Sequence, residues 1–206
     1  MKGAMYFMVI LIAAPAGVAE AASGPDAAIA IRTYNYAAVS AGHLAAARSE
    51  AGQIFKRAGI LLQWIDCKVR AEDDGAVCTE PLFAGRDLML RLIDRTPAGG
   101  ERIVALGESI LDREQRGGLL MTINVCPVRV VAGRAFTPIT TLLGRAVAHE
   151  IGHLLLGSAK HPRQGLMRAL WSHDELRGFK PAHWGFSATE AARMRETLRG
   201  TAHTAD

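Results

Sequence analysis

The sequence predicts an α+β domain in which a mixed β-sheet packs on an N-terminal helix and on a second, longer helix, with a third helix at the C-terminus. Short apolar segments rich in strand-forming residues recur through the first two thirds of the chain, while three other segments repeat apolar residues at helical spacing. The 206 residues are 50% hydrophobic and 21% charged, without an internal repeat or low-complexity linker. These features fit one domain, which we expect to span residues 22–206.

The first strand, helix and second strand are expected in that order. Residues 29–36 alternate and are rich in strand formers, so they predict a strand. Ser40 can cap a helix over residues 41–58, and Gly59 is placed to end it. The short, nearly apolar run at residues 60–65 then fits a buried strand.

Three further strands are expected, at residues 87–93, 102–106 and 119–125, the last ending at Cys126-Pro127. The polar segment 66–85 separates them from the earlier elements and is interpreted as a loop.

The long helix is predicted from Thr137-Pro138 to Leu156. A threonine hydroxyl can accept a hydrogen bond from the first turn, and proline is favoured at the first helical position. Gly157 is placed to end the helix.

An irregular stretch is expected from there to about residue 171. Ser187 and Glu190 then form a capping-box pattern, which predicts a last helix over residues 188–199.

The N-terminal residues resemble an export signal in composition. Lys2 provides a positive start, residues 6–14 are apolar but too short to span a bilayer comfortably, and Ala19-Glu20-Ala21 offers a cleavage site. We therefore expect residues 1–21 to be a signal peptide, the mature protein to be secreted or periplasmic, and no stable membrane anchor to remain after cleavage. A retained anchor is the alternative.

If the protein is exported, two of its three cysteines can form a disulfide. Cys67 and Cys78 flank a polar loop and are the expected disulfide in an oxidising compartment, with Cys126 unpaired, although three cysteines allow three pairings. The formal net charge is +4 and the basic residues are scattered, so no nucleic-acid partner is expected.

The segment His149-Glu150-Ile151-Gly152-His153 carries the chemistry. On a helix, residues four apart lie one turn apart on nearly the same face, so both imidazoles can reach one zinc ion. Glu150, about 100° around the axis, can face the open side of the metal and take a proton from a water held there. The pattern predicts zinc-dependent peptide hydrolysis with Glu150 as the base.

The rest of this helix is apolar on nearly all sides, which predicts a buried helix. Two histidines in such a helix need polar partners, and a metal ion is the simplest partner. The alternative is that both are ordinary core histidines.

A catalytic zinc site usually has three protein ligands. His161 is the leading candidate for the third, because Gly157 lets the chain turn back toward the helix. Glu175 is the next candidate and would give a site with two histidines and one glutamate. The remaining candidates are less favoured: His173, Asp174 and His183.

The stretch from His149 to His161 resembles the metzincin clan of zinc peptidases. In that clan the helix ends at a glycine, a third histidine follows, and a methionine-containing turn lies beneath the metal. Gly157, His161 and Met167 match these features, and the resemblance implies that Met167 is a hydrophobic floor. The spacing departs from the clan, since the gaps before and after Gly157 are each four residues instead of three.

A wider resemblance is to a group of exported bacterial proteins with this lengthened motif. It implies a zincin-like fold, in which an edge strand pairs with the substrate backbone, and residues 119–125 are the candidate for that strand. The alternative is that they form an ordinary interior strand. The segments that carry this resemblance are Tyr34-Asn35-Tyr36-Ala37, Ala58-Gly59-Ile60, Trp64-Ile65-Asp66-Cys67 and Trp171-Ser172.

The sequence therefore predicts an exported zinc metallopeptidase, an endopeptidase acting on peptides or proteins. Two alternatives stay open: a gluzincin-like peptidase that uses Glu175 as the third ligand, and a non-catalytic exported zinc-binding or interaction protein. The sequence predicts no oligomeric state.

Overall fold

The computed structural model describes residues 27–68, 76–83, 85–96, 105–112, 117–178 and 180–202. The expected signal peptide, residues 1–21, and most of the expected strand at 102–106 lie outside the described residues. The elements are β1 (Ala27–Asn35), α1 (Ala41–Arg57), β2 (Ile60–Cys67), α2 (Ala76–Thr79), β3 (Asp87–Ile93), β4 (Gly107–Asp112), β5 (Gly117–Asn124), α3 (Val125–Arg134), α4 (Ile139–Leu156), α5 (His173–Arg177), the short 3-10 helix η3 (Pro181–Trp184) and α6 (Ala188–Ala202).

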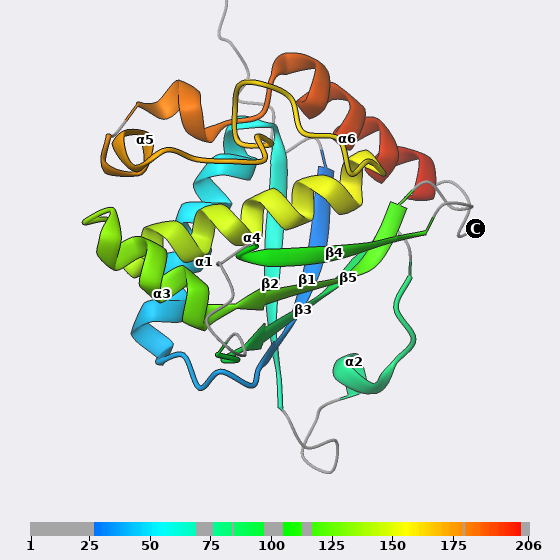
Figure 1. Cartoon of the computed structure of the whole chain (residues 1–206). Helices are drawn as coiled ribbons and strands as arrows, with labels where there is room; N and C mark the ends of the chain where they lie inside the picture. Colours follow the sequence, from blue (N-terminus) through cyan, green and yellow to red (C-terminus); the bar gives the residue numbers. More distant parts are fainter. Residues whose placement is uncertain are drawn as a thin grey trace, which may run out of the picture.

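The strands form one five-stranded mixed sheet in the order β2-β1-β3-β5-β4 (Figure 1). β1 is parallel to both β2 and β3, β3 is parallel to β5, and β4 alone among the described strands runs antiparallel, against β5. In Figure 1, α4 crosses in front of β1 and β2. The mixed sheet, the two long helices and the C-terminal helix confirm the predicted α+β fold.

The interior position of β5 corrects one expectation. The candidate substrate-pairing strand, residues 119–125, is β5, and it is hydrogen-bonded on both sides, to β3 and to β4. Its backbone groups are already paired, so the reading of an ordinary interior strand is the correct one. The strand at this edge of the described sheet is β4.

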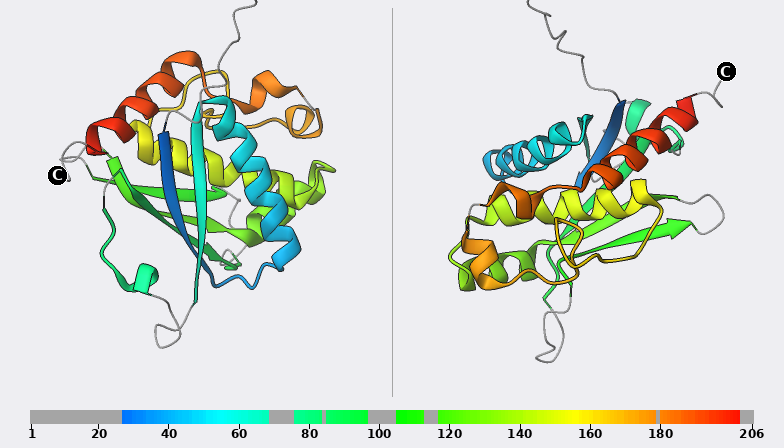
Figure 2. Two further views of the ribbon diagram at one scale, coloured as in Figure 1. Left: turned by 180° about the vertical axis from the view of Figure 1, so that it is seen from behind. Right: turned by 90° about the horizontal axis from the view of Figure 1, so that it is seen from above.

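Helix α4 is almost completely buried, as its apolar sequence predicts. It lies against α1, and the views from behind and from above show the two helices side by side (Figure 2). At Gly144 an added Cβ would lie 2.5 Å from the Ala47 carbonyl oxygen, so the two backbones approach closely there. This packing holds the helix that carries His149 and His153 in place.

The ends of α4 follow the prediction only in part. Gly157 caps the C-terminus in a left-handed conformation with φ of 57°, as expected. At the N-terminus, however, Pro138 is the capping residue and no side chain caps the helix. The Thr137 hydroxyl instead donates to the Leu176 carbonyl at 2.8 Å, so its predicted capping role is wrong. The hydroxyl therefore bonds to a residue distant in the sequence and not to the first turn of α4.

Helices α2, α3 and α5 and the 3-10 helix η3 were not expected, and α2 lies in the segment 66–85 that was interpreted as a loop. Cys126-Pro127 was interpreted as the end of a strand, but Asn124 accepts from the Cys126 amide and α3 begins at once. A proline in the first helical turn lacks only an amide that would have no intrahelical partner, so the residue that ends a strand can also start a helix.

Helix α6 matches its sequence signal. Ser187 and Glu190 form the expected reciprocal capping bonds, and the helix continues to Ala202. Cys67 and Cys78 are joined in a disulfide, and Cys126 is the free cysteine. Within the described part of the chain, no helix has both the length and the apolar character needed to cross a membrane.

Candidate metal centre

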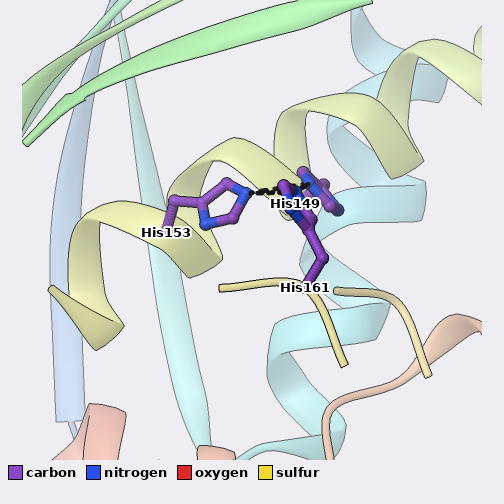
Figure 3. A group of neighbouring side chains, drawn as sticks. All are labelled: His149, His153 and His161. Carbon is purple, nitrogen blue, oxygen red and sulfur yellow. Dashed lines mark hydrogen bonds between the residues drawn. The ribbon is translucent and has the colours of Figure 1, made fainter. Parts of the chain in front are cut away.

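Three histidine side chains meet at one point (Figure 3). His149 and His153 come from α4, and His161 comes from the segment that follows it. The Nε2 atom of His149 lies 3.0 Å from that of His153 and 3.3 Å from that of His161, and the Nε2 atoms of His153 and His161 are 3.1 Å apart. The structure therefore brings together the three histidines that the sequence singled out.

The lengthened spacing does not prevent this meeting. After the left-handed Gly157, the Ser158 amide donates to the His153 carbonyl, which turns the chain back along the last turn of α4. His161 then lies with its ring nearly parallel to that of His149, with ring centroids 5.3 Å apart. A glycine is suited to the turn because a side chain is strained at positive φ.

Backbone carbonyls orient the two helix histidines. Nδ1 of His149 lies 3.0 Å from the Leu166 carbonyl oxygen, and Nδ1 of His153 lies 2.6 Å from the Ser158 carbonyl oxygen. A carbonyl only accepts hydrogen bonds, so each Nδ1 carries the proton and each Nε2 keeps a lone pair. Such outer hydrogen bonds are typical of histidines that bind metal ions.

Burial favours the neutral form of both helix histidines. Burial lowers the pKa of His149 to about 4, against the hydrogen bond to Leu166, which raises it. Burial also lowers the pKa of His153. Neutral imidazoles with outward Nδ1 protons place their lone pairs toward one another, an arrangement that is unfavourable unless a cation lies between them.

This donor set fits zinc. Zinc is bound in proteins by imidazole nitrogens, and a catalytic site has three protein ligands and one open position. Among the described residues, the potential metal-binding group contains the three histidines and no fourth side chain.

Glu150 lies beside the histidines and is 7% exposed. Burial raises its pKa to about 7, the hydrogen bond from Ser109 lowers it, and the nearby Glu108 carboxylate raises it. The Ser109 hydroxyl donates to Oε2 of Glu150 at 2.5 Å. A carboxyl group with a pKa near neutrality is suited to exchange protons at physiological pH.

A cavity of about 610 Å³ opens over the histidines and Glu150. Most of its wall is apolar and includes side chains from α3, α4, α5 and the segment before β4. Arg168 and Trp171 also line it. The main apolar side chains of the wall are Leu106, Leu111, Val131, Leu170 and Leu176.

Met167, which the resemblance assigns to a methionine-containing turn, packs against α4 at Gly152. Its side chain is buried, and an added Cβ on Gly152 would lie 2.5 Å from the Met167 sulfur. The sulfur therefore contacts α4 at a residue that lies between the two helix histidines in the sequence, and its role as a hydrophobic floor stays a prediction.

The structure does not bring Glu175 to the histidines. Its carboxylate accepts from the Ser172 amide at 2.8 Å and pairs with Arg168, and these bonds lower its pKa to about 2. The Glu175 side chain caps the N-terminus of α5. The weaker candidates are likewise not part of the histidine group in the described structure: His173, Asp174 and His183.

The sequence interpretation missed Ser109. It lies on β4, for which the apolar pattern is weak, and a single serine in a short strand carries no recognisable motif. Only the packing of β4 against α4 shows that its hydroxyl meets Glu150.

Three solved structures have a similar fold. Archaemetzincin from Methanopyrus kandleri matches with a TM-score of 0.50 at 13% identity, over 83% of this chain and 96% of that one. A zinc-dependent peptidase from Methanocorpusculum labreanum matches with a TM-score of 0.50 at 12% identity, over 80% and 99%. Metalloproteinase-II from Bacteroides fragilis matches with a TM-score of 0.52 at 14% identity, over 86% of this chain and 55% of that protein. No protein-family model and no curated protein matches the sequence.

Proposed function

We propose that this protein is a zinc-dependent metallopeptidase. The observation that carries the proposal is the convergence of three Nε2 atoms beside a buried carboxylate at the base of one cavity. The shared fold and the names of the three similar proteins support the same class. The lengthened spacing around Gly157 supports placing the chain in an exported, metzincin-like group of its own.

His149, His153 and His161 would hold the zinc ion. Bound zinc supplies a Lewis acid that increases the acidity of water and polarises a carbonyl group. Glu150 would accept the proton of the attacking water and deliver it to the leaving amine, a role that its position beside the histidines in the cavity wall supports. This carboxylate is largely buried beside a mostly apolar cavity wall.

The substrate in this proposal is a peptide or protein bound in extended form. β4 pairs with β5 and is the last strand in the order of the described sheet, and in this proposal the substrate adds a strand beside it. A chain bound along a strand edge can continue in both directions, which supports cleavage within a polypeptide.

We extend the proposal to an exported location. The signal-like residues 1–21 and the Cys67–Cys78 disulfide support it, because disulfides persist in oxidising compartments. Mass spectrometry of the protein recovered from the medium or periplasm tests this: an N-terminus near Ala22 is expected, and recovery of the uncleaved chain in the cytoplasm would contradict it.

The test of the activity compares zinc-loaded wild-type protein with Glu150→Gln on a broad peptide library. The wild type should cleave internal peptide bonds, and the variant should keep one zinc per chain while losing about 100-fold to 10,000-fold in rate, the range for general-base catalysis. Zinc binding without any cleavage by the wild type would instead support a non-catalytic zinc-binding protein.

A further inference from the structure

One face of β4 is built around the Glu150 side chain. Gly107 and Ser109 are two residues apart on the strand, so they lie on the same face of the sheet. Their partners in the register with β5 are Ile123 and Met121, both completely buried. This is the face that α4 covers.

Ser109 makes two contacts with Glu150. Its hydroxyl oxygen lies 2.5 Å from Oε2 of the Glu150 carboxylate and 3.0 Å from the Glu150 backbone oxygen. A hydroxyl has one proton to donate, and the shorter, charge-assisted bond to the carboxylate is the stronger of the two. The other face of the strand turns away, and Ile110 on that side is exposed.

Gly107 leaves the space that the carboxylate occupies. An added Cβ at this position would lie 2.9 Å from Cγ and 3.0 Å from Oε1 of Glu150, and 2.5 Å from Cδ1 of Ile123. Any side chain here would displace Glu150 or Ile123. Both residues therefore act on the Glu150 side chain. Gly107 leaves room for it, and Ser109 donates a hydrogen bond to it.

We propose that Ser109 is a positioning residue for Glu150: its hydroxyl, with the room left by Gly107, holds the carboxylate in one orientation toward the cavity. The inference rests on the proposed peptidase function. β4 is also the last strand of the described sheet, so the strand that we propose for substrate binding would orient the base as well.

The first experiment compares the zinc-loaded variants Ser109→Ala, Ser109→Thr and Ser49→Ala. Ser49 is an exposed serine on α1 and serves as the matched control. For Ser109→Ala we expect kcat to fall by about 10-fold to 100-fold with KM and zinc content unchanged. The free energy of a hydrogen bond to a charged group corresponds to a rate factor of this size. Ser109→Thr, which keeps the hydroxyl, should recover most of the rate. A kcat of Ser109→Ala within twofold of the control would overturn the inference.

The second experiment needs neither zinc nor substrate. Thermal unfolding of the metal-free protein is measured for Ser109→Ala in the wild-type background and in a Glu150→Leu background, which has no carboxylate to accept. We expect the midpoint shift caused by Ser109→Ala to shrink by at least half in the second background. An equal shift in both backgrounds would show that the hydroxyl does not act on the Glu150 side chain.

The two experiments separate the inference from the function on which it rests. If the wild type cleaves no peptide, the proposed function fails and any catalytic purpose of Ser109 fails with it, whatever the coupling in unfolding. If the wild type cleaves peptides but either test on Ser109 fails, the function stands and the positioning role is wrong.

Discussion

The Nε2 atoms of His153 and His161 lie 3.1 Å apart, although a left-handed turn at Gly157 separates their backbones. The relationship matters because it joins a helix residue to a loop residue at the position where a third ligand is needed. His161 is exposed and the chain that carries it has no regular structure, so the turn is what brings it within reach.

The first prediction concerns this third ligand. His161→Ala should lower zinc affinity by more than the roughly 10-fold to 100-fold that loss of an outer-shell partner costs. Glu175→Gln, which keeps the capping of α5, should bind zinc like the wild type because Glu175 lies outside the histidine group. Competition with a chromophoric chelator measures both affinities. Loss of zinc from Glu175→Gln with retention by His161→Ala would instead support the gluzincin-like alternative.

The second prediction is a pH dependence of the metal-free protein. The pKa of His149 falls from 6.5 to about 4 on folding, so between these values only the unfolded chain takes up the proton. Acidification from pH 6.5 to pH 4 therefore destabilises the fold by about 3 kcal/mol through this group. His153, whose pKa burial also lowers, acts in the same direction.

The titration of Glu150 changes the stability of the fold with pH in the opposite direction. Its pKa rises from 4.5 to about 7 on folding, so between these values only the folded chain holds the proton. Raising the pH from 4.5 to 7 destabilises the fold through this group, again by about 3 kcal/mol. Urea unfolding across this range should show that Glu150→Gln gains more stability with rising pH than the wild type does. Parallel pH curves for the two proteins would contradict the prediction.

The third prediction compares two glycines in helices that pack together. Gly144→Ala should destabilise the protein by about 1 to 3 kcal/mol, because its Cβ would lie 2.5 Å from the Ala47 carbonyl oxygen and the backbone there cannot yield easily. Gly52→Ala should instead stabilise it by up to about 1 kcal/mol, since nothing lies within 4 Å of the added carbon in a helix interior. Chemical denaturation measures both. Stabilisation by Gly144→Ala as well would mean that the α1–α4 contact is looser than described.

The fourth prediction concerns the disulfide. Replacing both Cys67 and Cys78 by serine should lower the free energy of unfolding by about 3 kcal/mol, the value for a loop closed over 11 residues. Zinc content should not change, because neither cysteine lines the cavity. Cys126→Ser, which removes the unpaired cysteine, should leave the disulfide intact by thiol titration. A double variant as stable as the wild type would show that the bond is not formed in the protein as isolated.

Local signals in the sequence were sufficient where a residue's role depends on its chain neighbours. The caps at Ser40, Gly157 and Ser187, and the i, i+4 spacing of His149 and His153, all act within one helical turn or its adjoining turn. The same local rules were ambiguous at Cys126-Pro127, where a strand end and a helix start look alike, and at Thr137, where a distant carbonyl took the hydroxyl.

The sequence by itself determined the local arrangement of the candidate site: two imidazoles and a carboxylate on one helix, and a glycine that ends it. Tertiary structure decided between His161, the leading candidate, and Glu175, and it placed β4 instead of β5 at the edge of the described sheet. It also showed that Ser109 meets Glu150. The physical reason is distance along the chain. Contacts between residues on different elements depend on how the whole sheet and its helices pack, and no short pattern encodes that packing.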